Sequence, residues 1–431
     1  MTGRAMRRLV WALFAWAAFV SMKPGRWAGG PARADVVLEL APSVGAGATD
    51  NARVVAGDAV HTSDSFTIVG GSARVRYAAN RSTHAIGYRG TYTHYLQDNG
   101  TTTLSNALAL TSDFELSARW ALAFSLTGAL TRTSGVDPND PAVFFQQAAV
   151  PGSTKYLSTA AMQRLGYQPT PASTYGETLS FAQLKYLEAM VNGVATPLPT
   201  TTVVTLALDW TREVGRDAFS LETAVGDSIV DDVDPMQMRG PYTQGHVFIG
   251  RMLAGWKHDL SAVWSTMLQA GPSIIFKLDG EGVIAPAAIA SVNYARVPWF
   301  AGVTASQTPS ANLFLGAATL SDQVLARLTV PLTRNETLYV GGYGGYVYAR
   351  IADARQHLTR AYDQVMGTLT VVYRFPGTRI AAALSYTALS QRGSEVPDYA
   401  VPDLARQSVL LTVRSDFAWG PGTPPLFGGP L

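Results

Sequence analysis

The chain has 431 residues, of which 47% are hydrophobic and only 15% are charged, and it contains no cysteine. This length fits one large domain or two ordinary ones. Without cysteine, nothing suggests a disulfide framework, a thiolate metal site or a lipidated N-terminus. The formal net charge is +2, but residues 1–34 carry six basic residues and no acid. The remaining 27 basic and 31 acidic residues carry a net charge of −4, which gives no reason to expect nucleic-acid binding.

The first segment has the pattern of a secretory leader. A basic start is followed by an apolar stretch from Leu9 to Met22, which is too short to span a bilayer comfortably. The sequence Ala-Arg-Ala ends at Ala34 and is typical of a cleavage site. We therefore predict a signal peptide over residues 1–34. The long basic segment from Lys23 to Arg33 leaves the exact cleavage site open and a retained N-terminal anchor as an alternative.

From Val36 onward the chain alternates apolar and polar residues, as in Val36, Leu38 and Leu40 against Glu39. A period of two predicts a β-strand with one apolar and one polar face. The same alternation returns along the chain in stretches at approximately 36–47, 65–79, 84–97, 102–116, 119–132, 201–213, 217–229, 246–257, 261–277, 284–294, 297–308, 313–330, 336–351, 361–375, 378–391 and 407–419.

These stretches predict an all-β, antiparallel transmembrane β-barrel over residues 35–419, with about 16 strands in a range of roughly 14–18. Short and long connections alternate, which places short turns and both termini on the periplasmic side of a bacterial outer membrane. A closed barrel also satisfies every backbone group in lipid. The alternative, a soluble sandwich or solenoid, would carry more charge on its outer face. Residues 420–431 are predicted to form a C-terminal tail.

Residues 133–200 have no clear alternation and are predicted to form one long extracellular loop, far above the usual length. The segments "AMQRLGYQP" and "SFAQLKYLEAMV" look helical, because Phe181, Leu184, Leu187 and Met190 follow one another at intervals of three. We expect this loop either to fold into the barrel as a constriction or to cap its surface.

If the apolar face meets lipid, the polar face lines a lumen. Its basic candidates are Arg74, Arg76, Arg89, Arg119, Arg251, Lys257, Lys277, Arg327, Arg374, Arg379 and Arg414. Its acidic candidates are Glu39, Asp113, Glu115, Asp209, Glu213, Glu222 and Asp416. The basic excess predicts a pore that favours anions, unless these charges pair into a structural ladder along the wall. A barrel of this size is wide enough for an aqueous channel.

The remaining chemistry-bearing residues point to structure rather than catalysis. Trp120, Trp210, Trp256, Trp299 and Trp419 fall near predicted strand ends and are expected to form an aromatic girdle at the membrane interfaces. None of the six histidines has a metal-ligand spacing, and neither a G-x-S-x-G nor an H-E-x-x-H motif is present. We predict no catalytic residue, no metal and no cofactor. An outer-membrane enzyme is the disfavoured alternative.

Three segments resemble a known group of barrels. The stretches "LAPSVGAGATDN" (Leu40 to Asn51), "SDSFTIVGGSARVRY" (Ser63 to Tyr77) and "YLQDNG" (Tyr95 to Gly100) are similar to outer-membrane β-barrels associated with exopolysaccharide operons. Those barrels have a Ser-Asp-Phe entry into the second strand, whereas here Ser65 separates Asp64 from Phe66.

The resemblance implies passage of a secreted exopolysaccharide across the outer membrane. The partners it implies are outer-membrane lipid, the barrel assembly machinery, a periplasmic polysaccharide export protein and the polysaccharide chain. Two alternatives stay open: a general diffusion porin for small polar or anionic solutes, and a non-conducting structural or adhesive barrel.

Overall fold

The computed structural model describes residues 35–51, 63–97, 102–133, 153–191, 194–195, 200–231, 245–277, 282–312, 317–352, 358–393 and 403–419. The chain divides into two units, Met1–Ala34 and Asp35–Leu431, and the description concerns the second. The predicted signal peptide and the predicted tail over residues 420–431 lie outside the described residues. Both stay predictions.

Every regular element of the described residues is a β-strand. The strands are β1 (Asp35–Thr49), β2 (Asp64–Ala79), β3 (Ser82–Tyr95), β4 (Thr102–Glu115), β5 (Trp120–Thr133), β6 (Ser153–Thr170), β7 (Ser173–Val191), β8 (Val194–Ala195), β9 (Thr200–Val214), β10 (Asp217–Asp231), β11 (Gly245–Asp259), β12 (Trp264–Lys277), β13 (Gly282–Arg296), β14 (Trp299–Asn312), β15 (Ala317–Pro331), β16 (Leu338–Ala352), β17 (Leu358–Arg374), β18 (Ile380–Arg392), β19 (Leu404–Ser415) and β20 (Phe417–Trp419). Within this part of the chain, no helix has the length and apolarity needed to cross a membrane.

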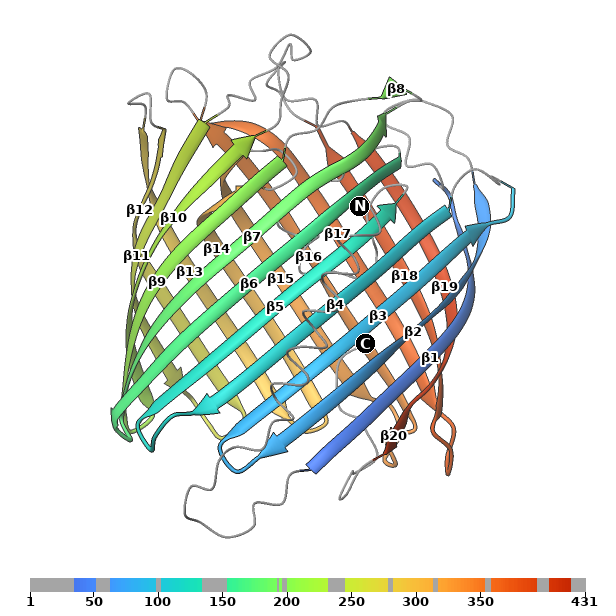
Figure 1. The fold of residues 1–431 in the computed structure, drawn as a ribbon, viewed down its shortest axis with the longest axis horizontal. Helices are drawn as coiled ribbons and strands as arrows, with labels where there is room; N and C mark the ends of the chain where they lie inside the picture. Colours follow the sequence, from blue (N-terminus) through green and yellow to red (C-terminus); the bar gives the residue numbers. More distant parts are fainter. Residues whose placement is uncertain are drawn as a thin grey trace, which may run out of the picture. The chain divides into compact units, whose positions relative to one another are not determined.

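Eighteen of these strands are long and form one closed antiparallel barrel, whereas β8 has only 2 residues and β20 has 3. Each long strand pairs with the next in the chain, and β9 follows β7 because β8 pairs only with the end of β7. The barrel closes between β1 and β19, where Val44 lies opposite Val413, and β20 continues this seam with Trp419 opposite Leu38. Figure 1 shows the strands running side by side at a common tilt.

One face of this sheet is apolar and exposed. Val36 and Val44 of β1 are 52% and 56% exposed, and their neighbours across the strand pairs, such as Val69 and Val413, are exposed too. The same alternation is found on successive strands, with Leu206 and Leu208 on β9 and Leu384 on β18 among the exposed side chains. A closed sheet with such an outer face is stable in lipid, because strand pairing satisfies the backbone groups around the wall. The protein is an outer-membrane β-barrel.

The two rims of the barrel differ. Tight turns at residues 80–81, 171–172, 215–216 and 297–298 join strands at the rim where β1 begins and β19 ends. Gly215, in one of these turns, has a φ of 65°. Glycine adopts this left-handed conformation without steric strain, whereas most other residues adopt it only at a cost in free energy. Most connections at the opposite rim lie outside the described residues. Short turns together with the chain ends mark the first rim as periplasmic.

The prediction of about 16 strands was close, and the prediction of a long loop over residues 133–200 was wrong. Residues 153–191 contain β6 and β7, two of the longest strands, which are part of the barrel wall. Ala161 lies opposite Phe181, and Phe181 lies opposite Val204 of β9. The spacing of three suggested a helix with one apolar face. In the structure Phe181 is exposed on the outer face and Leu184 is buried, at 2% exposure, on the inner face, so the two belong to opposite faces of a strand. Residues 153–191 are therefore part of the wall and not a constriction, and residues 134–152 lie outside the described residues.

Candidate functional site

The strand registers place most of the predicted lumen residues on the face opposite the exposed apolar one. These residues are Arg74 and Arg76 on β2, Arg89 on β3, Asp113 and Glu115 on β4, Asp209 on β9, Arg251 on β11, Arg327 on β15, Arg374 on β17 and Arg414 on β19. Arg119 and Arg379 lie instead in the turns before β5 and β18, at the periplasmic rim. That these residues act in transport stays a prediction.

Three of the arginines form a basic stripe, defined as Arg74, Arg76 and Arg89. Arg74 and Arg76 alternate on β2, and Arg89 lies opposite Ser72 on the neighbouring strand β3. All three side chains are exposed, and none makes an ion pair with another described residue. Glu39 is the direct neighbour of Arg74 in the register, yet the two form no ion pair. The three cations of the stripe are therefore exposed to the lumen without ion pairs among the described residues, although Asp35 and Glu39 of β1 lie on the same inner face.

Across the lumen wall from β6 to β11, by contrast, the charges are paired. Arg164 of β6 reaches over β7 to Asp209 of β9, with an Nη2–Oδ2 distance of 3.3 Å. The residue between them on β7 is Gly176, where a Cβ would lie 2.3 Å from Asp209 Oδ1, so only glycine leaves room for this contact. Sequence reasoning missed Arg164, because the segment that carries it was taken for a loop.

The pairing continues on the next strands. Glu222 of β10 lies directly opposite Asp209, and two carboxylates in that relation repel each other. Arg251 of β11 offsets this, because its Nε and Nη2 atoms donate to Glu222 Oε1 at 3.0 and 2.6 Å. We call the group Arg164, Asp209, Glu222 and Arg251 the charge ladder. It is neutral as a whole, which fits the structural alternative considered for the wall charges.

The other predicted lumen arginines differ in their surroundings. Arg414 pairs with Asp416 at 2.5 Å, and the Arg374 guanidinium lies over the Tyr339 ring at 4.8 Å from its centroid. Arg379 donates to the carbonyl oxygen of Ala418 at 3.5 Å and so helps to hold β20 in place. Arg327 is exposed on β15. These contacts assign structural work to Arg374, Arg379 and Arg414 in addition to any effect on the lumen potential.

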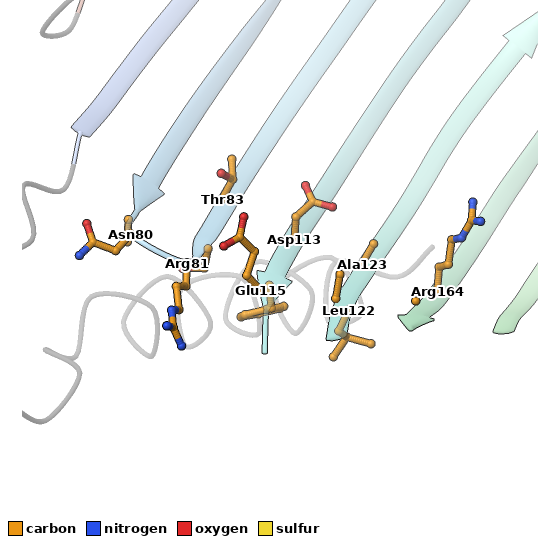
Figure 2. A pocket seen from close by; sticks show the side chains of 13 residues that line it. Asn80, Arg81, Thr83, Asp113, Glu115, Leu122, Ala123 and Arg164 are labelled. Carbon is orange, nitrogen blue, oxygen red and sulfur yellow. The ribbon is translucent and has the colours of Figure 1, made fainter. Parts of the chain in front are cut away.

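A pocket of about 270 Å³ lies at the periplasmic rim between β2 and β6. Figure 2 shows Asp113 and Glu115 projecting from β4, with Arg81 below them and Arg164 further along the wall. Two carboxylates and two guanidiniums around one cavity suit a polar or hydrated group better than an apolar one. The charged groups of this rim pocket are thus of both signs, in contrast to the basic stripe above it.

The extracellular half contains an element that the sequence did not suggest. Pairing between β13 and β14 stops at Ala288 and Gln307, so Gly282–Ala287 and Thr308–Asn312 are not paired with each other. The end of the β14–β15 hairpin instead turns inward, since β15 comes within 8 Å (Cα to Cα) of β10 and β11. Three other strands separate β11 from β15 in the sheet, and about 4.8 Å separates each neighbouring pair, so this approach crosses the lumen. We call residues 308–312 and 317–321 the infolded end.

The infolded end is held by packing on both of its sides. Ala318 and Leu320 form an apolar cluster with Ile275 of β12 and Ala285 of β13. On the other side, Asn312 Nδ2 donates to the buried Tyr362 hydroxyl of β17 at 3.3 Å. Thr319 and Ser321 are also buried. The infolded end therefore narrows the extracellular half of the lumen, in the role that had been expected of residues 133–200.

A weak sequence signal marks the place where β13 and β14 separate. Proline lacks an amide hydrogen and is disfavoured inside a paired sheet. Pro286 of β13 and Pro309 of β14 each lie two residues beyond the last pair, Ala288 and Gln307, and Pro272 is opposite Pro286 on β12. The positions of these prolines mark a weakened seam but do not indicate the direction in which the hairpin turns.

Four of the predicted girdle tryptophans lie on the outward face near the periplasmic rim. They are Trp120, Trp210, Trp256 and Trp299, and Trp264 at the start of β12 joins them. Trp419 is opposite Leu38 in the strand register, and its side chain lies outside the described part of the structure. The Trp120 ring stacks on Tyr167 with 4.4 Å between centroids, and Trp256 donates through Nε1 to Asp217 at 2.9 Å. Apolar rings with one polar contact are suited to the boundary between lipid and water. Their function as a girdle stays a prediction.

Among the described residues, no group of three or more histidine, aspartate or glutamate side chains is arranged to hold a metal ion. No protein-family model matches the chain, and no curated protein matches it significantly. Solved structures similar to it include the ferric-catecholate import receptor Fiu from E. coli K12, with 9% identity, coverage of 91% of this chain and 84% of the other, and a TM-score of 0.47.

Two further similar structures are OpdK of Pseudomonas aeruginosa, solved with vanillate, and OccAB3 of Acinetobacter baumannii. OpdK has 7% identity, coverage of 90% of this chain and 99% of the other, and a TM-score of 0.44. OccAB3 has 8% identity, coverage of 90% and 99%, and a TM-score of 0.45.

Proposed function

We propose that the protein is a passive channel for polar solutes across the outer membrane, with a preference for anions, and not an enzyme. The observation that supports this most is the contrast between the two walls of the lumen. On one wall the charge ladder neutralises its own charges, whereas on the other the basic stripe is exposed and lacks ion pairs within the described residues. Uncompensated positive charge on a low-dielectric wall concentrates anions and repels cations.

The proposed cargo is a secreted exopolysaccharide. Support comes from the resemblance of residues 40–51, 63–77 and 95–100 to barrels associated with exopolysaccharide operons. The basic stripe adds a physical reason, because several weak contacts along a wall let a long chain bind without being trapped. A periplasmic export protein would then deliver the chain to the polar mouth around Asp113 and Glu115.

A general diffusion porin for small anionic solutes is the second candidate. The infolded end supports it, because a narrowed extracellular half suits small molecules better than a polymer. A non-conducting structural or adhesive barrel is the third candidate, and it has no support from a particular contact.

Ion selectivity tests the channel itself. In planar bilayers with a salt gradient, the wild-type protein should give a reversal potential that indicates anion preference. The variant Arg74→Gln, Arg76→Gln, Arg89→Gln should lose most of that preference, because the basic stripe is its source. The variant Glu222→Gln should increase the preference, because it leaves Arg251 without its carboxylate. Absence of conductance in the folded wild-type barrel would leave only the structural role.

Gene deletion tests the cargo. If the channel exports a polymer, its loss should abolish surface polysaccharide and leave polymer or precursors in the periplasm, while uptake of small nutrients continues. Restoration by the wild-type gene but not by the triple glutamine variant would connect export to the basic stripe. Normal surface polysaccharide in the deletion strain would exclude export and favour the diffusion porin.

A further inference from the structure

The outer surface of the barrel carries an uncommon pair of charges at its extracellular end. Arg132 of β5 lies directly opposite Lys155 of β6 in the strand register. Both residues share the outward parity of Phe124 and Leu126, which are exposed on the lipid-facing side. Like charges in directly opposite positions destabilise a strand pair. A compensating negative charge is therefore expected.

The described residues supply only part of that charge. Lys155 Nζ lies 3.4 Å from Glu188 Oε1, and both side chains are substantially exposed. Arg132 is exposed and makes no ion pair or side-chain hydrogen bond with a described residue. Near the extracellular ends of these strands, Arg132 and Lys155 have only the carboxylate of Glu188 beside them. These three residues carry a net charge of +1 on β5, β6 and β7, which Figure 1 shows side by side.

A comparable position on another part of the wall holds two side chains that contact each other. On β10 and β11, Asp227 and His246 are also outward and close to the extracellular ends of their strands. There the His246 Nδ1 and Asp227 Oδ2 atoms are 2.8 Å apart. This position on β10 and β11 thus has a side-chain partner, whereas Arg132 on β5 has none among the described residues.

The position of Arg132 and Lys155 along the membrane normal determines which layer of the membrane they contact. Trp120 and Arg132 are twelve residues apart on β5, and Trp120 belongs to the aromatic residues of the periplasmic rim. At about 3.4 Å per residue and a tilt of about 40°, Arg132 lies about 31 Å further along the membrane normal. The apolar band of such barrels is only about 25 Å tall. Arg132 and Lys155 therefore reach the headgroups of the outer leaflet.

We propose that Arg132 and Lys155 bind the phosphate of a phosphorylated glycolipid in the outer leaflet, whose acyl chains lie over Leu130, Leu157 and Leu104 below. Arginine presents a planar set of donors to phosphate oxygens, and lysine adds a point charge. Phosphate at this place offsets the repulsion between the two cations. The proposal is independent of what the lumen transports.

Lipid binding by the purified barrel in non-ionic detergent tests the proposal. The probes are lipid A and lipid A from which the phosphates have been removed, and native mass spectrometry measures the bound fraction. Wild-type protein should bind the phosphorylated form better by on the order of tenfold. Equal binding of the two lipids would overturn the proposal, and this comparison needs no variant.

The double variant Arg132→Gln, Lys155→Gln should lose that preference. A charge-matched control, Arg74→Gln, Arg76→Gln, removes two cations from the inner face and should keep it. Heat-modifiable mobility in gels shows that each variant is folded. An unchanged preference in the first variant, or an equal loss in the control, would contradict the assignment. Inorganic phosphate should displace the lipid only weakly, and complete displacement at millimolar concentration would show a free-anion site instead.

Discussion

At the scale of single residues, one step along a strand decides whether a side chain meets lipid or the lumen. On β4, Leu108 lies opposite Tyr88 and Gly128 on the outer face. Ala109 lies opposite Gly87 and Thr127 on the inner face. Both positions are near the middle of the strand, so they differ in facing and hardly in depth.

This pair supports a direct prediction. Leu108→Arg should destabilise the folded barrel by about 2–4 kcal/mol, because placing a charge at the lipid midplane is costly. Ala109→Arg should be tolerated, because its side chain enters the lumen. Urea titration of folding into lipid vesicles measures both. Equal destabilisation would show that the outer and inner faces have been assigned incorrectly.

The same residue scale shows how much of the lumen site the sequence could predict. Strand parity was sufficient to place Arg74, Arg76 and Arg89 on one face, because side-chain direction depends only on period two. The partners of Asp209 and Glu222 could not be predicted, since pairing across strands depends on register. Arg164 was missed for a further reason: two whole strands around it were taken for a loop.

At the scale of elements, the sequence predicted sixteen of the long strands, and each corresponds to a strand of the structure. It failed at β6 and β7, whose alternation is weak because Gln163, Glu177 and Gln183 lie on the outward face. Polar residues at these outward positions interrupt the alternation of apolar and polar residues from which a strand is predicted. The infolded end was beyond prediction, because a hairpin that leaves the wall keeps its strand pattern and changes only its neighbours.

Cysteine scanning tests the strands that the sequence missed. The chain has no cysteine of its own, so each introduced thiol reports alone. Along residues 178–182, cysteines at 179 and 181 should react with lipid-soluble maleimides, and those at 178, 180 and 182 with water-soluble ones. The reason is that Leu179 and Phe181 are outward whereas Ser180 is inward. Uniform labelling by the water-soluble reagent would indicate a loop and would contradict β7.

The infolded end leads to a prediction about conductance. Replacing residues 310–319 by Asn-Gly joins Pro309 to Leu320, which are already opposite in the register, through a turn that suits a hairpin. Single-channel conductance should rise, because the segment that crosses the lumen is gone. The variant Leu320→Asp should act in the same direction by placing a charge in the cluster with Ile275 and Ala285. Unchanged conductance in both folded variants would mean that the infolded end does not limit flow.

At the scale of the whole barrel, the two membrane interfaces are built differently. Every tryptophan whose side chain is described lies on the outward face toward the periplasmic rim, as Trp120 and Trp299 illustrate. At the other rim the outward face carries charges, among them Arg132, Lys155 and Asp227. Aromatic rings suit a phospholipid interface, and charges suit a layer of phosphorylated glycolipid. This asymmetry matches a membrane whose two leaflets differ.

The asymmetry can be measured by the intrinsic fluorescence of the protein. The mature barrel is reconstituted in one direction into vesicles, and a cysteine at Asn80 in a periplasmic turn reports the orientation. Headgroup nitroxide lipids confined to the leaflet beside that turn should quench most of the tryptophan emission, because the rings lie at that interface. The same lipids confined to the opposite leaflet should quench little. The variant Leu104→Trp, which adds an outward ring near the extracellular end, should restore quenching from that leaflet. Equal quenching from both leaflets in the wild-type protein would show that the tryptophans are not confined to the periplasmic interface.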